Sequence, residues 1–108
     1  MSVDWQKLKT DLIAAREAAQ AVPNAGDGGS ANNDAASVVI PRVRGRKVQD
    51  VARSAGLGCS ERTRFGTRVF LLNSPKGGQG DHNTQQAEAM VKVLKARGWA
   101  ASMWWQID

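Results

Sequence analysis

The sequence is poor in the residues that build most catalytic and metal sites. Its 108 residues include one cysteine, one histidine and no tyrosine. A single cysteine excludes an internal disulfide and a zinc site built from several cysteines. No apolar run approaches the roughly 18–20 residues needed to span a bilayer, and no apolar signal segment opens the chain. We therefore expect a cytoplasmic protein with no membrane partner.

Positive charge is concentrated in the C-terminal two-thirds of the chain. Residues 1–34 hold three basic and five acidic side chains, whereas residues 35–108 hold twelve and five. Seven arginines and one lysine crowd one segment: Arg42, Arg44, Arg46, Lys47, Arg53, Arg62, Arg64 and Arg68. Crowded like charges repel each other, and the guanidinium fork suits bidentate contacts with phosphate. The segment therefore predicts a surface that binds a polyanion, with a merely solvated surface as the alternative.

The hydrophobic pattern predicts an α+β domain in which an N-terminal helix and two further helices accompany a small mixed sheet. The two further helices pack on one face of that sheet. Residues 1–22 are expected to form the N-terminal helix, 23–36 a polar Gly/Asn loop, and 37–108 a basic α+β core. Within the core we expect strands near 38–40, 63–72 and 101–108, and helices over 47–57 and from 83 or 84 to 98. The N-terminal helix either docks on its own domain or pairs with a second copy, so a homodimer stays open.

Five arginines are the predicted phosphate ligands. Residues 63–72 fit either one long strand or a hairpin that turns at Gly66–Thr67. In one long strand Arg64 and Arg68 share a face, because side chains alternate with period two. The other three, Arg42, Arg44 and Arg46, point the same way wherever their stretch is extended.

Two further features extend this predicted site. A loop with Gly78, Gln79 and Gly80 leads into a helix near Thr84, where free backbone N–H groups favour an anion. The loop lacks the order of a P-loop or a dinucleotide motif, so an ordinary loop is the alternative. Trp104 on the terminal strand either stacks a base or sugar or lies under the N-terminal helix.

The signals for catalysis and for a resident metal are weak. Cys59 and His82 are the sole residues of their types, and a predicted strand and loop separate them. The oxygen-bearing side chains between Asp27 and Asp34 miss the spacing of a calcium loop. We therefore expect no catalytic residues, no metal and no cofactor.

Residues 49–57 resemble the first helix and turn of the helix-turn-helix in repressors of the lactose-repressor type. A recognition helix should then begin near Ser60. Residues 63–70 instead favour a strand and include Gly66. The resemblance therefore fails where base reading would occur.

Four motifs along the chain carry a second resemblance. They are Asp27-Gly28-Gly29 with Asn32 and Asp34, Gly78-Gln79-Gly80 with Thr84, the helix segment 87–90, and the ending Trp105-Gln106-Ile107-Asp108. Over residues 5–108 the chain thereby resembles small uncharacterised proteins encoded by bacterial phages and prophages. Ala31 and Asp81 depart from the pattern of that family. The resemblance implies a phage-versus-host role in the bacterial cytoplasm, and an ordered polar loop over 27–34. That loop, with Gln106 and Asp108, would join the site.

We expect a non-enzymatic, phage-type binding protein. Its Arg-rich face would engage the phosphates of a nucleic acid or a small nucleotide through charge pairing and stacking, with little base readout. The alternative is a protein-interaction module that inhibits a host defence complex through the same basic face. A third reading is a small hydrolase built on Asp27, Asp34, His82 and Asp108.

Overall fold

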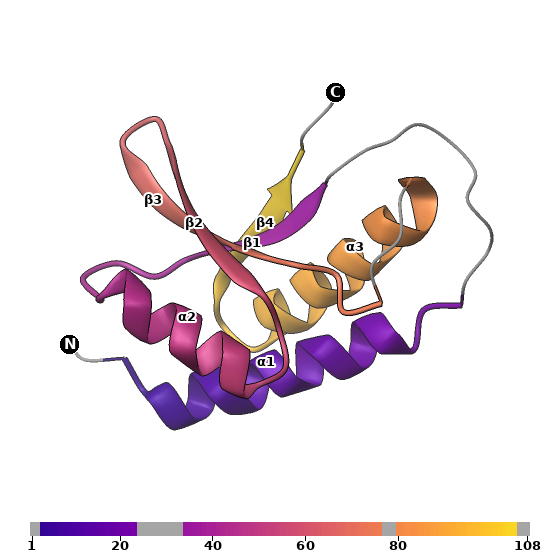
Figure 1. The fold of residues 1–108 in the computed structure, drawn as a ribbon, viewed down its shortest axis with the longest axis horizontal. Coiled ribbons are helices and arrows are strands. Elements are labelled where there is room, and N and C mark those ends of the chain that lie inside the picture. The colour runs from indigo at the N-terminus through magenta and orange to yellow at the C-terminus, as the bar shows by residue number, and fades with distance from the viewer. Residues whose placement is uncertain (1–2, 24–33, 77–79, 106–108) are drawn as a thin grey trace.

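The computed structural model describes residues 3–23, 34–76 and 80–105, and it contains three helices and a four-stranded sheet (Figure 1). The elements are α1 (Trp5–Gln20), β1 (Ala35–Val39), α2 (Gly45–Ser54), β2 (Cys59–Arg64), β3 (Thr67–Leu72), α3 (Gly80–Ala96) and β4 (Ala100–Trp104). The predicted α+β class and element order are confirmed. Among the described helices, none is both long and apolar enough to cross a membrane.

The strands lie in the order β2-β3-β1-β4, and all three neighbouring pairs are antiparallel. The sheet is therefore antiparallel, whereas a mixed sheet was expected. The reason lies in the crossovers: α2 joins β1 to β2 with β3 between them, and α3 joins β3 to β4 with β1 between them. Each βαβ unit is thus split by a strand of the other, as in ferredoxin-like domains.

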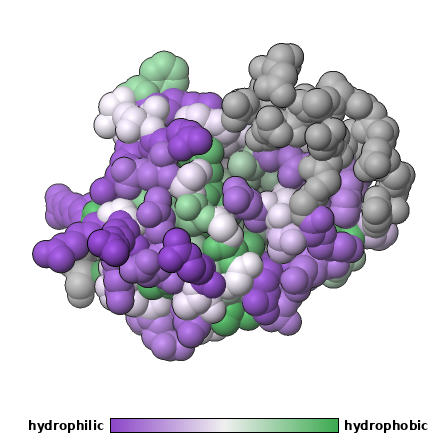
Figure 2. Space-filling model, viewed as in Figure 1, coloured by the Kyte–Doolittle hydropathy of each residue, from purple (hydrophilic) through white to green (hydrophobic). Residues whose placement is uncertain are grey.

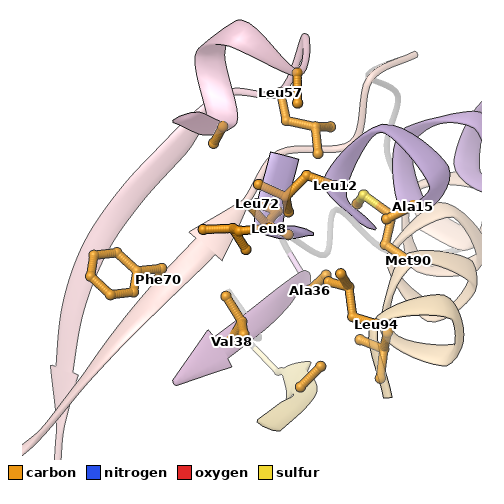
Figure 3. Close-up of a cluster of buried hydrophobic side chains, with 14 of the residues drawn as sticks. Leu8, Leu12, Ala15, Ala36, Val38, Leu57, Phe70, Leu72, Met90 and Leu94 are labelled. Carbon is orange, nitrogen blue, oxygen red and sulfur yellow. The ribbon is translucent and has the colours of Figure 1, made fainter. Parts of the chain in front are cut away.

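Helices cover one face of the sheet. On that face α3 contacts β1 and β4, α2 contacts β2, and α1 lies against α3 and α2 as a further layer (Figure 1). The apolar side chains from the three layers meet in one core (Figure 3). Its largest fully buried members are Phe70, Leu8, Leu12, Leu72, Met90 and Leu94. The strand residues in this set alternate with residues of the opposite face, as period two requires.

The hairpin between β2 and β3 turns one residue earlier than expected. Phe65 and Gly66 form the turn, with φ of 52° and 78°. Positive φ at both central residues is the signature of a type I′ turn, whose twist matches that of the flanking strands. Thr67 therefore pairs with Arg64, and Arg68 pairs with Thr63. Directly opposed residues share a face and the next pair takes the other, so Arg64 and Arg68 lie on opposite faces of the sheet. The hairpin alternative is therefore the one that forms, and the shared face expected for one long strand does not occur.

The N-terminal helix docks on its own chain. Leu8, Leu12, Ala15 and Ala19 form its buried stripe. The helix begins after Asp4, whose side chain accepts a hydrogen bond from the Lys7 N–H at 3.0 Å. It thus begins and ends within the predicted range 1–22.

A buried carboxylate fixes α1 against the corner where α3 meets β4. Asp11 is 3% exposed and accepts hydrogen bonds from Lys7 Nζ at 2.6 Å, Trp99 Nε1 at 2.8 Å and Arg97 Nη1 at 2.9 Å. Burial raises the pKa of Asp11, but the hydrogen bonds from Lys7, Trp99 and Arg97 outweigh burial and hold the pKa below its usual value. The ionised carboxylate is therefore the stable form in the folded protein.

The first prediction concerns Asp11→Asn, which keeps the shape but removes the charge. We expect the free energy of unfolding to fall by about 1–2 kcal/mol at neutral pH, because charged hydrogen bonds are lost in a buried site. The pKa in the folded protein is below the usual 3.8, so the contribution is complete above that value and is lost as the pH falls through the folded pKa. Urea unfolding at neutral pH and near pH 3 measures both effects.

The matched control is Glu17→Gln, which removes an exposed carboxylate from the same helix. We expect this control to leave stability within about 0.5 kcal/mol of the parent protein. A gap between the parent and Asp11→Asn that stays constant on acidification would contradict the assigned role of the charge.

Candidate phosphate-binding site

The sheet topology separates the candidate residues into two groups at opposite ends of the strands. The C-terminal end of β1, the start of α2 and the β2–β3 turn lie at one end, which we call the basic end. Its basic residues are Arg42, Arg44, Arg46, Lys47, Arg62, Arg64 and Arg68. The start of β1, the end of β3 and the start of α3 lie at the other end, which we call the polar end. Its polar residues are Asp34, Ser74, His82, Asn83, Thr84 and Gln86.

An open pocket of about 510 Å³ lies at the basic end beside the start of α2. It is lined by Val3, Trp5, Arg42, Val43, Arg44, Arg46, Lys47 and Asp50, so four basic side chains face one acid. Within the part of the chain that the structure describes, no ion pair joins these four cations to a carboxylate. Figure 2 shows that strongly hydrophilic residues cover the surface around α2. The pocket is therefore an open concentration of positive charge.

The first turn of α2 adds to the positive potential of the pocket. The helix begins at Gly45 without a side-chain cap and without an acidic residue in its first turn. An uncapped helix N-terminus carries partial positive charge, from backbone N–H groups that lack intrahelical partners. The pocket thus combines side-chain cations with a helix dipole of the same sign.

Arg42, Arg44 and Arg46 meet at the pocket for a reason the sequence did not indicate. The stretch is not extended: Pro41 and Arg42 form a turn, and Arg42 has a φ of 61°. Arg44 then occupies the N-cap of α2, and Arg46 lies in the first helical turn. The expectation that an extended segment aligns the three arginines is wrong, although the structure does bring them together.

Arg68 lies on the helix-covered face and joins the hairpin to the turn before α2. Its guanidinium donates to the Val43 carbonyl and lies 3.9 Å from Glu61 Oε1. Glu61 in turn lies so close to Gly45 that a Cβ at position 45 would be 2.0 Å from Glu61 Oε1. A side chain at position 45 would therefore have to displace the Glu61 carboxylate. These contacts make Arg68 a positioning residue for the pocket.

Arg64 and Trp104 meet on the face of the sheet that no described helix covers. The Arg64 guanidinium carbon lies 3.7 Å from the centroid of the Trp104 ring, a cation–π stack. Arg64 ends β2 and Trp104 ends β4, which are the two edge strands. The twist of a sheet lifts diagonally opposite corners toward the same face, which explains how the two ends approach. Trp104 thus packs against Arg64 and away from α1.

The polar end is held together by hydrogen bonds among its own residues. Thr84 Oγ1 donates to Asp34 Oδ2 at 3.2 Å, and Asn83 Nδ2 donates to the Asp34 carbonyl at 2.8 Å. Ser74 Oγ donates to Asn83 Oδ1 at 2.7 Å. These bonds tie the start of α3 to β1 and to the loop after β3. The hydrogen bonds of the polar end therefore serve the fold, and its side chains are less free to bind a ligand than those of the basic end.

The remaining candidates at the polar end are placed only in part. The helix α3 begins at Gly80. Thr84 therefore lies inside the helix, whereas the sequence placed it near the helix start. Gly78 and Gln79 lie outside the described residues, as do Asp27, Asn32, Gln106 and Asp108. Nε2 of His82 is buried and has no hydrogen-bond partner among the described residues.

The thiol of Cys59 is poorly suited to nucleophilic chemistry. Burial raises its pKa to about 11, and the negative charge of Glu61 adds to the effect. Among the residues that the structure describes, no three His, Cys, Asp or Glu side chains are grouped so that they could hold a metal ion. The described side chains of the basic end are of the kinds that form ion pairs and stacking contacts.

Sequence reasoning missed Trp5 and Phe65 as surface residues of the basic end. Trp5, at the start of α1, is half-buried and lines the pocket. Phe65 was assigned to a strand, but it is 99% exposed at the hairpin tip. The one available signal for Phe65 was the following Gly66, which marks a turn.

Comparison of the chain with protein-family models, with curated proteins and with solved structures finds no match. Function is therefore inferred from the side chains of the basic end.

The second prediction concerns the reactivity of Cys59. With a pKa of about 11, the thiol is almost fully protonated near neutral pH. We expect iodoacetamide labelling, followed by mass spectrometry, to be slow near pH 8 and to accelerate up to about pH 11. Unfolding in urea should speed labelling at pH 8, because the thiol then regains its ordinary pKa. A labelling rate that levels off near pH 8 in the folded protein would contradict the assigned environment.

Proposed function

We propose that the basic end binds the phosphates of a nucleic acid. The observation that carries this proposal is the pocket in which Arg42, Arg44, Arg46 and Lys47 surround the uncapped start of α2 without an ion-pair partner among the described residues. Each phosphate contact by such a cation releases condensed counterions, and this release drives binding in a manner that depends on salt. The proposal assigns no catalytic step to the protein.

The spread of the cations supports a polymer as the ligand over a small nucleotide. The pocket holds four basic residues, while Arg62 and Arg64 lie on the hairpin outside it. Arg68 joins the hairpin to the turn at Val43, so both groups lie at the same end of the sheet, although Arg62 and Arg64 are on its uncovered face. A strand with regularly spaced phosphates can engage both groups at once, whereas a single nucleotide fills only one.

Aromatic side chains add a second kind of contact. Trp5 lines the pocket, and Lys47 Nζ lies 5.6 Å from the centroid of its ring. An indole beside cations can stack a base while the cations hold the adjacent phosphates. Such contacts tolerate any base, so the proposed binding has little sequence preference.

The resemblance to phage and prophage proteins supports a setting for this activity. A phage protein that binds nucleic acid would act in the cytoplasm of the bacterial host. In the alternative role, the same surface binds an acidic groove of a host defence protein, and the experiment below separates the two.

The third prediction tests the pocket by charge removal. The double variant Arg44→Gln/Arg46→Gln should weaken binding to labelled single-stranded oligonucleotides by about tenfold or more at moderate salt. It should also reduce the slope of log affinity against log salt by about 1.4, that is, roughly 0.7 for each lost phosphate contact. The matched control, Lys92→Gln/Lys95→Gln, removes the same charge from exposed positions on α3. We expect the control to change the slope by much less.

The outcomes separate the proposed ligands. Absence of binding to single- and double-stranded DNA and RNA at low salt would rule out the nucleic-acid function. Binding of free nucleotides alone would assign the pocket to a small ligand. Stoichiometric co-purification with a host protein, in the absence of nucleic-acid affinity, would support the inhibitor role.

The fourth prediction separates fold from function at Arg42. An arginine with a φ of 61° occupies a conformation that Asn adopts with less strain. We expect Arg42→Asn to keep or raise the free energy of unfolding, by up to about 1 kcal/mol. The same variant should bind single-stranded nucleic acid several-fold more weakly, because it removes one cation from the pocket. Thermal unfolding and binding titrations measure the two effects. An unchanged affinity would exclude Arg42 from the interface.

A further inference from the structure

The tip of the β2–β3 hairpin carries an exposed aromatic ring. Phe65 is 99% exposed, the highest value among the large apolar side chains that the structure describes. Figure 2 shows apolar surface at the outer end of this hairpin, beside hydrophilic surface. A Cβ built on the adjacent Gly66 would meet no atom within 4 Å, so the turn is clear of the rest of the protein. Phe65 thus contributes nothing to the core.

The backbone at Phe65 favours a different residue. A type I′ turn prefers Asn, Asp or Gly at its first central position, because φ is positive there. Phe65 has a φ of 52°, an unfavourable value for a bulky side chain. Neither packing nor backbone conformation therefore accounts for the phenylalanine, which leaves contact with a partner as its physical explanation.

The charges around Phe65 indicate the chemistry of that partner. Arg62 and Arg64 are exposed on the adjoining strand, on the face opposite Glu61 and Arg68. Arg62 Nη1 donates to the Glu61 carbonyl at 3.0 Å, and Arg64 stacks on Trp104. Neither guanidinium forms an ion pair with a carboxylate of the described residues. An apolar ring beside two such guanidinium groups complements a ligand in which flat apolar faces alternate with negative charges. A nucleic-acid strand, with bases and phosphates, has that pattern.

We propose that Phe65 stacks on a base of a nucleic-acid strand whose phosphates are held by Arg62, Arg64 and the basic pocket. This inference rests on the proposed function and adds a specific base-stacking residue to it. The hairpin is held to the pocket through the contact between Arg68 and Val43, so one strand can reach both. The phenyl ring contacts the face of the base, and the interaction therefore does not depend on which base is present.

The test compares the parent protein with Phe65→Asn, which suits the turn and leaves the net charge unchanged. We expect binding to a labelled single-stranded oligonucleotide to weaken roughly tenfold, with an unchanged salt slope, because no phosphate contact is lost. Thermal stability should be equal or higher, since Asn-Gly is a favoured type I′ pair. On an oligonucleotide whose bases are replaced by abasic sites, the parent and Phe65→Asn should bind alike.

Trp105→Ala is the matched control, because Trp105 is also an exposed aromatic residue, 56% exposed, but follows β4 far along the chain from the hairpin. We expect this control to retain the affinity of the parent. An equal loss in both variants would overturn the assignment to Phe65, because it would indicate a general effect of exposed aromatic surface.

The remaining outcomes distinguish this inference from the proposed function. If the parent binds with a salt-dependent affinity and Phe65→Asn binds equally well, the stacking role is overturned and the phosphate-binding function stands. If the parent protein does not bind nucleic acid at all, both the stacking role of Phe65 and the proposed phosphate-binding function are overturned. If Phe65→Asn changes the oligomeric state seen in size-exclusion chromatography with light scattering, while binding is unaltered, the tip is a contact between copies.

Discussion

The closure of the core depends on the hydrogen bonds of one buried carboxylate, Asp11. This side chain holds α1 to the corner formed by α3 and β4, through Arg97 and Trp99. With α1 in place, its apolar stripe packs against α3. The same docking brings Trp5, at the start of α1, to the wall of the basic pocket. A structural ion pair on one side of the molecule therefore positions an aromatic residue of the candidate site.

The split βαβ topology places the cluster of basic residues and the hydrogen-bonded polar residues at opposite ends of the sheet. Because α2 follows β1, its N-terminus lies at the same end as the β2–β3 turn, and the arginines of both segments gather there. Because α3 follows β3, its N-terminus lies at the other end, where Asp34 and Asn83 bond to each other. The two helix N-termini are consequently used differently. The start of α3 is linked to its own chain, whereas the start of α2 has no side-chain cap and lies beside four cations and the Glu61 carboxylate.

The sequence predicted the class and the arginine-rich site better than it predicted their geometry. Apolar periodicities of 3.6 and 2 identified α1, α3 and β4, because burial imposes them directly. The hairpin register was missed, since Phe65 occupies a turn position where Asn or Gly is usual. Arg64 and Arg68 lie on opposite faces because a hairpin forms in place of one continuous strand. The sequence predicted that Arg42, Arg44 and Arg46 lie together, but the predicted cause, an extended segment, is wrong. Charge density marks the residues, but the turn at Pro41 and the early start of α2 at Gly45 bring them together, and neither has a strong sequence signal.

Backbone strain and large exposed side chains coincide at the basic end. Arg42 and Phe65 are the two residues other than glycine that have positive φ within the described ranges, and both lie at this end of the sheet. Each is a large, exposed side chain at a position where Gly or Asn would be more stable. One supplies a cation and the other an apolar ring, which are the two kinds of group that a nucleic-acid strand engages. Strain that the fold does not require, at two sites on one surface, is the pattern expected where side chains are retained for binding.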